Sequence, residues 1–302
     1  MNILLPLLNS PAALAAPFAV VLGVAQDAGH PQAGCDKVCC RAAWGDAALR
    51  HQPASLGLVD PETRQRWILD ATPALPDQLR LLDSHAPWST GGPPDGVLLT
   101  HAHIGHYTGL VHLGREVMGA RAVPVYAMPR MAAFLQQHGP WSQLVDLANI
   151  SLQPMAADTP FALSPSLRVT ALQVPHRDEL SETVGFIVRG PTRALLWLPD
   201  IDKWRRWDRE LAAVLASVDV AYVDATFFDG AELPGRDMAE IPHPFIVETL
   251  AAVADLPASE RAKLRLVHLN HSNPALHADS DARARVEAAG VQVAEAGVVE
   301  PL

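Results

Sequence analysis

The segment Thr100-His101-Ala102-His103-Ile104-Gly105-His106 is the most informative part of this chain. It places three histidines within six residues, directly after the apolar run Gly96-Val97-Leu98-Leu99. That run is short and follows Pro93, Pro94 and Asp95, which is typical of a buried strand. A loop leaving such a strand can direct several imidazoles to one point, and neutral imidazole is the commonest metal ligand in proteins. The stretch therefore predicts a metal site.

Four further apolar runs are expected to be strands that end in metal-competent residues. Each end is a weak signal alone, because an aspartate there often caps a helix and a single histidine is often a core residue. Together they could converge on one edge of packed sheets. The residues are His176, Asp200 with Asp202 close behind, Asp224, and His268 with His271.

The composition indicates a globular protein with a sizeable core. The chain has 302 residues, of which 49% are hydrophobic and 19% are charged, enough for one large domain or two small ones. The formal net charge is −10 and no basic stripe is present, so nucleic acid is not an expected partner. An anionic substrate is still compatible with this charge, because a bound metal can be the largest local charge.

The N-terminus allows two interpretations. Residues 3–8 and 12–16 resemble the apolar region and small-residue cleavage site of a signal peptide, which would place the protein in the periplasm or outside the cell. Residues 1–16 contain no Lys or Arg, however, and residues 9–11 interrupt the apolar run. An apolar extension of a cytoplasmic protein is the alternative. No run of 18 apolar residues exists, so no transmembrane anchor is expected.

Strands and helices alternate along residues 18–302 in two successive halves without a low-complexity linker. This order predicts a single α/β domain with helices outside packed sheets, preceded by residues 1–17 as leader or extension. A helix is expected over residues 109–119, leading away from the histidine loop, and a buried strand over residues 264–270.

The chain has only three cysteines, Cys35, Cys39 and Cys40. An odd number within six residues argues against a disulfide framework. Metal binding explains the cluster better than three ordinary buried thiols, which remain the alternative.

The order of these residues resembles the metallo-β-lactamase fold, and within it coenzyme PQQ biosynthesis protein B and its relatives. The motif layout is also similar to the phosphoribosyl cyclic phosphodiesterase of phosphonate breakdown and to the tRNA 3′-processing ribonuclease. The resemblance implies a four-layer αββα sandwich of two mixed β-sheets with helices outside and a metal site between the sheets. It is carried by Asp70, the histidine motif, His176, Asp200 and His268, and by residues 21–23, 29–32, 71–73, 223–226, 235–238 and 268–274.

The resemblance also implies the ligands of two active-site metals, with Zn²⁺ expected and Mn²⁺ or Fe²⁺ as alternatives. His101, His103 and His176 would hold one ion, and Asp200 would bridge it to a second ion held by His106 and His268.

The family motif has an aspartate where this chain has Gly105. We therefore expect the first metal position to have its full set of protein ligands and the second metal position to be weak or empty, unless Asp202 or water compensates.

The cysteines fit a structural zinc in the same family, held by Cys35, Cys39, Cys40 and His271. Cys39 would replace the family's middle cysteine, whose place is taken by Lys37 here. Such a zinc would pin the loop 29–43 over the strand end that carries His268.

The resemblance places His243 where related phosphodiesterases have a histidine that acts as general acid. The alternative is that His243 is an ordinary histidine of a surface loop. Asp224 would orient a ligand histidine or cap a turn. Arg177 and Arg236 are candidates for binding an anionic substrate, with surface or structural roles as alternatives. Asp200 is expected to serve in catalysis as well as in metal binding.

We expect a metal-dependent hydrolase of a phosphodiester or similar small anionic ester that uses metal-bound hydroxide, since a divalent metal lowers the pKa of bound water toward ~7. PQQ-biosynthesis B proteins tend to lack the full ligand set that is present here, which favours hydrolysis. A role in quinone cofactor biogenesis or transport without hydrolysis stays open, as do a lactonase, a thioesterase and a homodimer.

Overall fold

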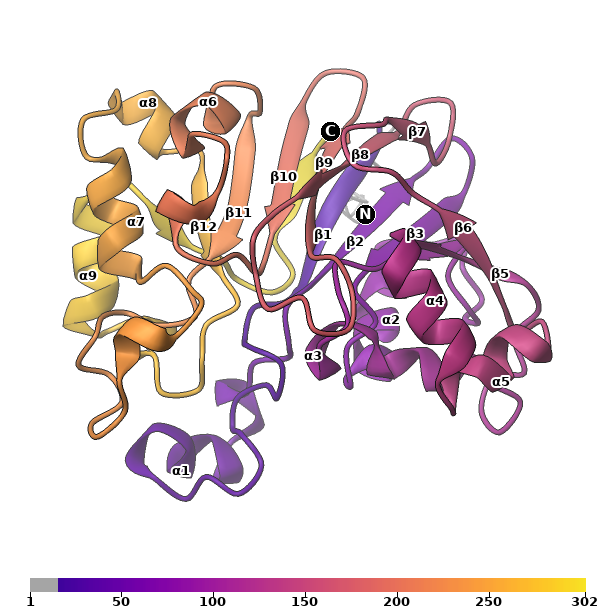
Figure 1. Cartoon of the computed structure of the whole chain (residues 1–302), viewed down its shortest axis with the longest axis horizontal. Helices are drawn as coiled ribbons and strands as arrows, with labels where there is room; N and C mark the ends of the chain where they lie inside the picture. The colour runs from indigo at the N-terminus through magenta and orange to yellow at the C-terminus, as the bar shows by residue number, and fades with distance from the viewer. Residues whose placement is uncertain (1–15) are drawn as a thin grey trace, which may run out of the picture.

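Two seven-stranded mixed sheets pack face to face in the computed structural model, which describes residues 16–302 (Figure 1). The first sheet has the order β14(Val299–Pro301), β1(Phe18–Gly23), β2(Ser55–Asp60), β3(Gln65–Leu69), β4(Gly96–Leu98), β5(Val123–Ala127), β6(Ile150–Pro154). The second has the order β13(Gln292–Val293), β12(Leu264–Val267), β11(Val220–Asp224), β10(Ala194–Leu198), β9(Val184–Arg189), β8(Arg168–Gln173), β7(Phe161–Ala162).

Helices cover the outer face of each sheet, so the predicted four-layer αββα sandwich is confirmed (Figure 1). The first sheet is covered by α2(Leu75–Ser84), α3(Ile104–Tyr107), α4(Pro129–Gln137) and α5(Trp141–Asp146). The second is covered by α6(Leu211–Leu215), α7(Ile246–Val253) and α9(Asp281–Ala288), with α8(Ala258–Arg261) alongside. Short 3₁₀ turns are η1(Ala47–Leu49), η2(Thr108–Leu113), η3(Trp204–Arg206), η4(Met238–Glu240) and η5(Pro274–Leu276).

The central strands β1, β10 and β11 are buried on both faces, which explains why they are continuous apolar runs in the sequence. Successive side chains of a strand point to opposite faces. In β1, Ala19 and Val21 join the core between the sheets, whereas Val20 and Leu22 join the core under the outer helices. Each sheet therefore contributes to two cores, and this fixes the register of its strands.

The parallel strands β3 and β4, and β10 to β12, finish near one edge of the sandwich; in Figure 1 the arrows of β10 and β11 point toward the side on which α1(Val38–Gly45) lies. The chain beyond β1 joins the two sheets at this edge. The backbone N–H of Gln26 donates to Leu269 O across 2.8 Å, and the N–H of Leu269 donates to Val24 O across 2.9 Å. The edge thus collects the strand-end residues singled out in the sequence.

Several local expectations are wrong. The expected helix over 109–119 is replaced by α3, which begins inside the histidine motif, and by η2, which ends at Leu113 because Gly114 has an extended backbone. The strand expected over 264–270 stops at Val267, because His268 has a left-handed φ of 66°. The helix α1 within the cysteine loop and the strand β14, which pairs with β1, were not expected.

No helix among residues 16–302 is long and apolar enough to cross a membrane. The two interpretations of the N-terminus concern residues 1–16, and residues 1–15 lie outside the described part of the chain.

Candidate metal centre

Three histidines from the two sheets form the first group of potential metal ligands. His101 and His103 follow β4, and His176 follows β8. His101 Nε2 lies 2.8 Å from His103 Nδ1, and the donor atoms of all three residues fall within 4.8 Å of one another. Both ring nitrogens of His176 are buried without a hydrogen-bond partner. Since such burial is costly, the arrangement fits a metal ion better than a purely structural cluster.

A second group consists of Asp27, His106, Asp200 and His268. Asp27 Oδ1 lies 3.1 Å from His106 Nε2 and 3.3 Å from His268 Nε2. Asp27 was not among the residues predicted from the sequence. It lies four residues beyond β1, so the rule that singled out the other strand ends would also have found it. The group offers two imidazole nitrogens and two carboxylates, a donor set suited to zinc.

Asp200, which follows β10, lies between the two groups. Its Oδ1 is 3.5 Å from His176 Nε2, and its Oδ2 is 2.9 Å from His106 Nε2. Burial alone would raise the pKa of Asp200, but the nearby imidazoles of His268, His106 and His176 hold it well below its usual value. Oδ2 is buried without a hydrogen bond of acceptable geometry. An ionised, incompletely satisfied carboxylate at this position can bridge two cations.

Asp70 and Thr100 set the orientation of the first sheet's histidines. Asp70 follows β3, and its carboxylate accepts hydrogen bonds from the Thr100 backbone N–H, the Thr100 hydroxyl and, across 2.9 Å, His106 Nδ1. Because the hydroxyl donates to Asp70, it accepts from His101 Nδ1, which lies 2.9 Å away. Both rings therefore keep the Nε2 lone pair for a metal.

Asp224 and Thr226 repeat this arrangement in the second sheet. Asp224, at the end of β11, accepts from the Thr226 hydroxyl across 2.8 Å and from His243 Nδ1 across 2.7 Å. The Thr226 hydroxyl lies 3.0 Å from His268 Nδ1 and is placed to accept its proton. Asp224 also accepts the backbone N–H of Ile201, next to Asp200. Of the two expected roles for Asp224, the geometry matches the orientation of histidines.

Asp202 does not join either group. Its Oδ2 accepts from Arg206 Nη1 across 2.5 Å, and its Oδ1 accepts from the Lys203 backbone N–H. Of the two possible compensations for Gly105, Asp202 is therefore excluded, because its buried carboxylate is already engaged and lies in neither ligand group.

A cavity of about 280 Å³ opens beside the two groups. Arg177 and Arg236 line it together with His243, and Arg177 Nη2 lies 3.4 Å from His103 Nε2. Both arginines are exposed, whereas His243 is buried. The remaining lining residues are Gln26, Phe227, Asp237, Glu240, Ile241 and Pro242. The guanidinium groups can pair with an anionic ligand, although Asp237 and Glu240 in the same lining offset part of their positive charge.

The three cysteines and His271 form a separate group on the loop that carries α1. Cys40 Sγ lies 3.4 Å and Cys39 Sγ 3.7 Å from His271 Nδ1, and Cys35 Sγ lies 3.8 Å from Cys39 Sγ. Burial raises the pKa of the Cys40 thiol to about 12. Three sulfurs and one imidazole match the donor set of a structural zinc site.

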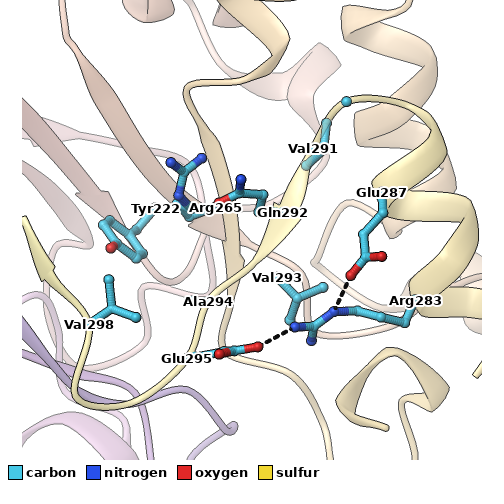
Figure 2. A pocket seen from close by; sticks show the side chains of 11 residues that line it. Tyr222, Arg265, Arg283, Glu287, Val291, Gln292, Val293, Ala294, Glu295 and Val298 are labelled. Carbon is cyan, nitrogen blue, oxygen red and sulfur yellow. Dashed lines mark hydrogen bonds and ion pairs between the residues drawn. The ribbon is translucent and has the colours of Figure 1, made fainter. Parts of the chain in front are cut away.

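Another cavity, of about 400 Å³, is shown in Figure 2 and is lined by residues of β11 to β13 and α9. Arg283 points between Glu287 and Glu295 and donates a hydrogen bond to each (Figure 2). None of the residues that line it belongs to a potential metal group. Its central charge is neutralised, so we do not assign it a role in the chemistry of this protein.

The fold and the two ligand groups define a member of the β-lactamase superfamily, and a family comparison agrees. The model of the "Beta-lactamase superfamily domain" matches residues 65–269, and the chain belongs to that family. Residues 65–269 include the histidine motif, His176, Asp200, Asp224, His243 and His268.

The chain is similar over most of its length to proteins named coenzyme PQQ synthesis protein B. It is 28% identical over 303 residues to that of Methylorubrum populi, covering 92% of this chain and 98% of the relative. It is also 28% identical over 308 residues to that of Xanthomonas campestris, with coverage of 92% and 98%.

Solved structures show the same fold. Zn(2+)-bound PqqB from Methylobacterium extorquens matches with a TM-score of 0.79 at 23% identity, over 94% of this chain and 100% of that one. A diphosphatase of the PhnP family matches with a TM-score of 0.66 at 20% identity, over 95% and 99%. Human tRNase Z, short form, matches with a TM-score of 0.56 at 14% identity, over 94% and 100%.

Proposed function

We propose that this protein is a metal-dependent hydrolase of a phosphodiester or similar small anionic ester. The observation that carries the proposal is the pair of ligand groups joined by Asp200, next to a cavity with two arginines and a buried histidine. A diphosphatase and a tRNase Z among the proteins of the same fold support the choice of a phosphoester.

His101, His103 and His176 would hold one ion, and Asp27, His106 and His268 the other, with Asp200 between them. A zinc ion held there would supply an activated water at neutral pH and would polarise an oxygen of the ester. A zinc-bound solved relative supports this metal, and Mn²⁺ and Fe²⁺ remain to be compared by measurement. Asp70, Thr100 and Thr226 hold the ligand rings in the orientation that this requires.

His243 would donate a proton to the leaving group. Its Nδ1–H is held by Asp224, so Nε2 is left to carry the transferable proton. Burial by itself would lower the pKa of His243, but the carboxylates of Asp224 and Asp200 raise it above its usual value. A buried histidine whose pKa is raised by two carboxylates and which lines the cavity is suited to this task.

Arg177 and Arg236 would bind the charge of the substrate. Phe227, Ile241 and Pro242 add an apolar side to the cavity. A volume of about 280 Å³ favours a small ester over a polymer, since pockets for drug-sized ligands begin at about 300 Å³.

The test measures metal content and hydrolysis of bis(p-nitrophenyl) phosphate in the purified chain and in the His103→Ala variant. We expect hydrolysis that depends on added zinc and that falls at least about 100-fold in the variant. His112→Ala removes a histidine outside the ligand groups and should behave as the unaltered chain. Full activity after metal removal would overturn the proposal. Turnover of a lactone or thioester instead would redirect it to those ester classes.

A role in quinone cofactor biogenesis without hydrolysis is the second candidate, favoured by similarity over 92% of the chain to coenzyme PQQ synthesis protein B. It predicts that the protein binds pyrroloquinoline quinone, followed by quenching of tryptophan fluorescence, while no ester is hydrolysed. Hydrolysis without quinone binding would exclude this role.

A structural zinc at Cys35, Cys39, Cys40 and His271 is the remaining part of the proposal. Cobalt substitution tests it, because a thiolate-to-cobalt absorption band should appear and should be lost in the Cys40→Ser variant. A cobalt protein without this band would contradict it.

A further inference from the structure

The residue at position 105 has no side chain, and the space beside it is filled by Asp27. A Cβ built on Gly105 would lie 2.3 Å from Asp27 Oδ1 and 2.4 Å from its Cα, closer than any real contact. Gly105 lies at the start of α3, between the ligands His103 and His106. Any larger residue at this position would have to move Asp27. The glycine and the aspartate are therefore one structural unit, although they are 78 positions apart in the sequence (105 − 27).

The Asp27 carboxylate is directed at the second group of ligands rather than at solvent. Its Oδ1 is within 3.3 Å of the Nε2 atoms of both His106 and His268, and Asp200 Oδ2 is 3.2 Å from the same nitrogen of His268. The Nδ1 atoms of the two histidines are already used by Asp70 and Thr226. Four donor atoms thus point at a common centre from four separate segments of the chain.

The backbone around Asp27 is held firmly. On its N-terminal side, Val24 and Gln26 form two hydrogen bonds with Leu269, the residue that follows His268. On its C-terminal side, a tight turn is closed by the bond from Gly29 N–H to Gln26 O, with Gly29 at a φ of 73° that suits glycine. Asp27 is therefore positioned by backbone pairing to the very segment that supplies His268, as a metal ligand should be.

We propose that Asp27 is the fourth protein ligand of the second active-site metal, and that Gly105 serves to leave room for it. This carboxylate comes from the loop after β1 and packs against Gly105 of α3. The second position then has Asp27, His106, His268 and the shared Asp200, the four protein donors that suit zinc. The inference rests on the proposed metal centre but not on hydrolysis of any ester.

The test counts metal ions and measures their affinity, without reference to activity. The full chain, the Asp27→Ala variant and the Gly105→Ala variant are loaded with zinc, dialysed and analysed by elemental mass spectrometry. We expect about three ions per chain to fall to about two in both variants. Zinc affinity at the lost position should fall at least about 100-fold, because changes to mere partners of metal ligands already cost 10–100-fold.

Cobalt absorption identifies which ion is lost. The thiolate band from the cysteine group should persist in both variants, and only the bands of nitrogen and oxygen ligands should weaken. Asp36→Asn, on the same loop but outside every ligand group, is the matched control and should bind as the unaltered chain does.

An Asp27→Ala protein that keeps its full count and affinity would overturn the proposal. If Asp27→Ala does not fold, Asp27→Asn is used instead, because it keeps the shape of the side chain. Loss of one zinc ion in Asp27→Asn would support the proposal, and retention of all ions would overturn it. A Gly105→Ala protein that retains the second ion would show that Asp27 does not need the space. Because none of these measurements uses a substrate, an inactive protein with the expected metal counts would contradict the proposed function and leave this inference standing.

Discussion

The pair Asp70 and Thr100 in the first sheet and the pair Asp224 and Thr226 in the second hold histidines by the same device. In each, a buried carboxylate accepts a threonine hydroxyl and one imidazole, and the hydroxyl accepts the next imidazole. Both are placed at strand ends: Asp70 follows β3, and Asp224 is the last residue of β11. Both sheets therefore fix the tautomer of a histidine at their common edge with the same hydrogen-bond arrangement.

The two pairs differ in what their histidines do next. Both rings held in the first sheet, His101 and His106, direct Nε2 into the potential metal groups. In the second sheet the threonine holds His268, and the carboxylate holds His243. His243 lies within reach of His176 and Asp200 as a potential ligand, but it also lines the cavity beside the metal groups. The same hydrogen-bonding device therefore supports metal binding on one side and, we infer, proton transfer on the other.

Asp224→Asn should have the largest effect and should separate the two pairs most clearly. In Asp224 one carboxylate oxygen accepts from the Ile201 N–H and His243 Nδ1, and the other accepts from the Thr226 hydroxyl. An asparagine side chain has only one acceptor oxygen, so it cannot keep all three hydrogen bonds. We expect kcat for an ester with a poor leaving group to fall about 100-fold or more, the usual contribution of a general acid. The metal count should be unchanged.

Leaving-group dependence checks this assignment. A good leaving group needs no proton, so the rate of hydrolysis of p-nitrophenyl esters should fall much less in Asp224→Asn than the rate for alkyl esters. His243→Ala is the matched variant and should show the same dependence. Equal losses for both ester types would mean that Asp224 acts only through His268 and the metal.

Asp70→Ala should act on metal binding and on folding instead. His106 and Asp70 are both almost fully buried. Burial alone would lower the pKa of His106, but Asp70, Asp200 and Asp27 hold it well above its usual value, so the metal-free protein buries an ion pair. Removing one partner of such a pair costs about 3–5 kcal/mol.

Urea unfolding of the metal-free protein measures this cost, and zinc competition should show an affinity lowered about 10- to 100-fold. Asp83→Ala, which breaks the more exposed Arg66–Asp83 pair, should destabilise the chain less. If Asp70→Ala keeps its metals and loses only turnover, the contrast between the two sheets is wrong.

Much of this architecture follows from the sequence. The strands were predicted because both of their faces are buried, and the ligand candidates because they end those strands. The overall sandwich came from the resemblance. Asp27 was missed, although it follows β1 by only four residues, because it lies inside a Gly- and Pro-rich loop with no periodicity. Its contact with Gly105 depends on long-range backbone pairing to Leu269, which no local pattern reveals.

Thr100→Val and Thr226→Val test the threonine hydroxyl that lies between the aspartate and a ligand histidine in each sheet, with little change in side-chain volume. Each removes the hydroxyl that accepts from a ligand histidine, His101 or His268, and should weaken one metal position about 10-fold. Thr226 Oγ1 also lies 3.1 Å from His243 Nδ1, so only Thr226→Val should change the leaving-group dependence. Serine at either position keeps the hydroxyl and should restore both properties. If the two valine variants show the same leaving-group dependence, the inferred functional difference between the two sheets is wrong.

Cys40→Ser should have the smallest effect on the active centre, and an indirect one. The cysteine group is connected to the second metal position twice, because Cys35 follows Asp27 on one loop and His271 follows His268 on the other. Loss of the proposed structural zinc would loosen both segments and lower zinc affinity at the second position roughly 5-fold, the low end of typical coupling between sites. The first position, whose ligands follow β4 and β8, should be unaffected. An equal loss at both positions would indicate general unfolding, whereas no loss at either would show that the backbone pairing with Leu269 alone is enough to position Asp27.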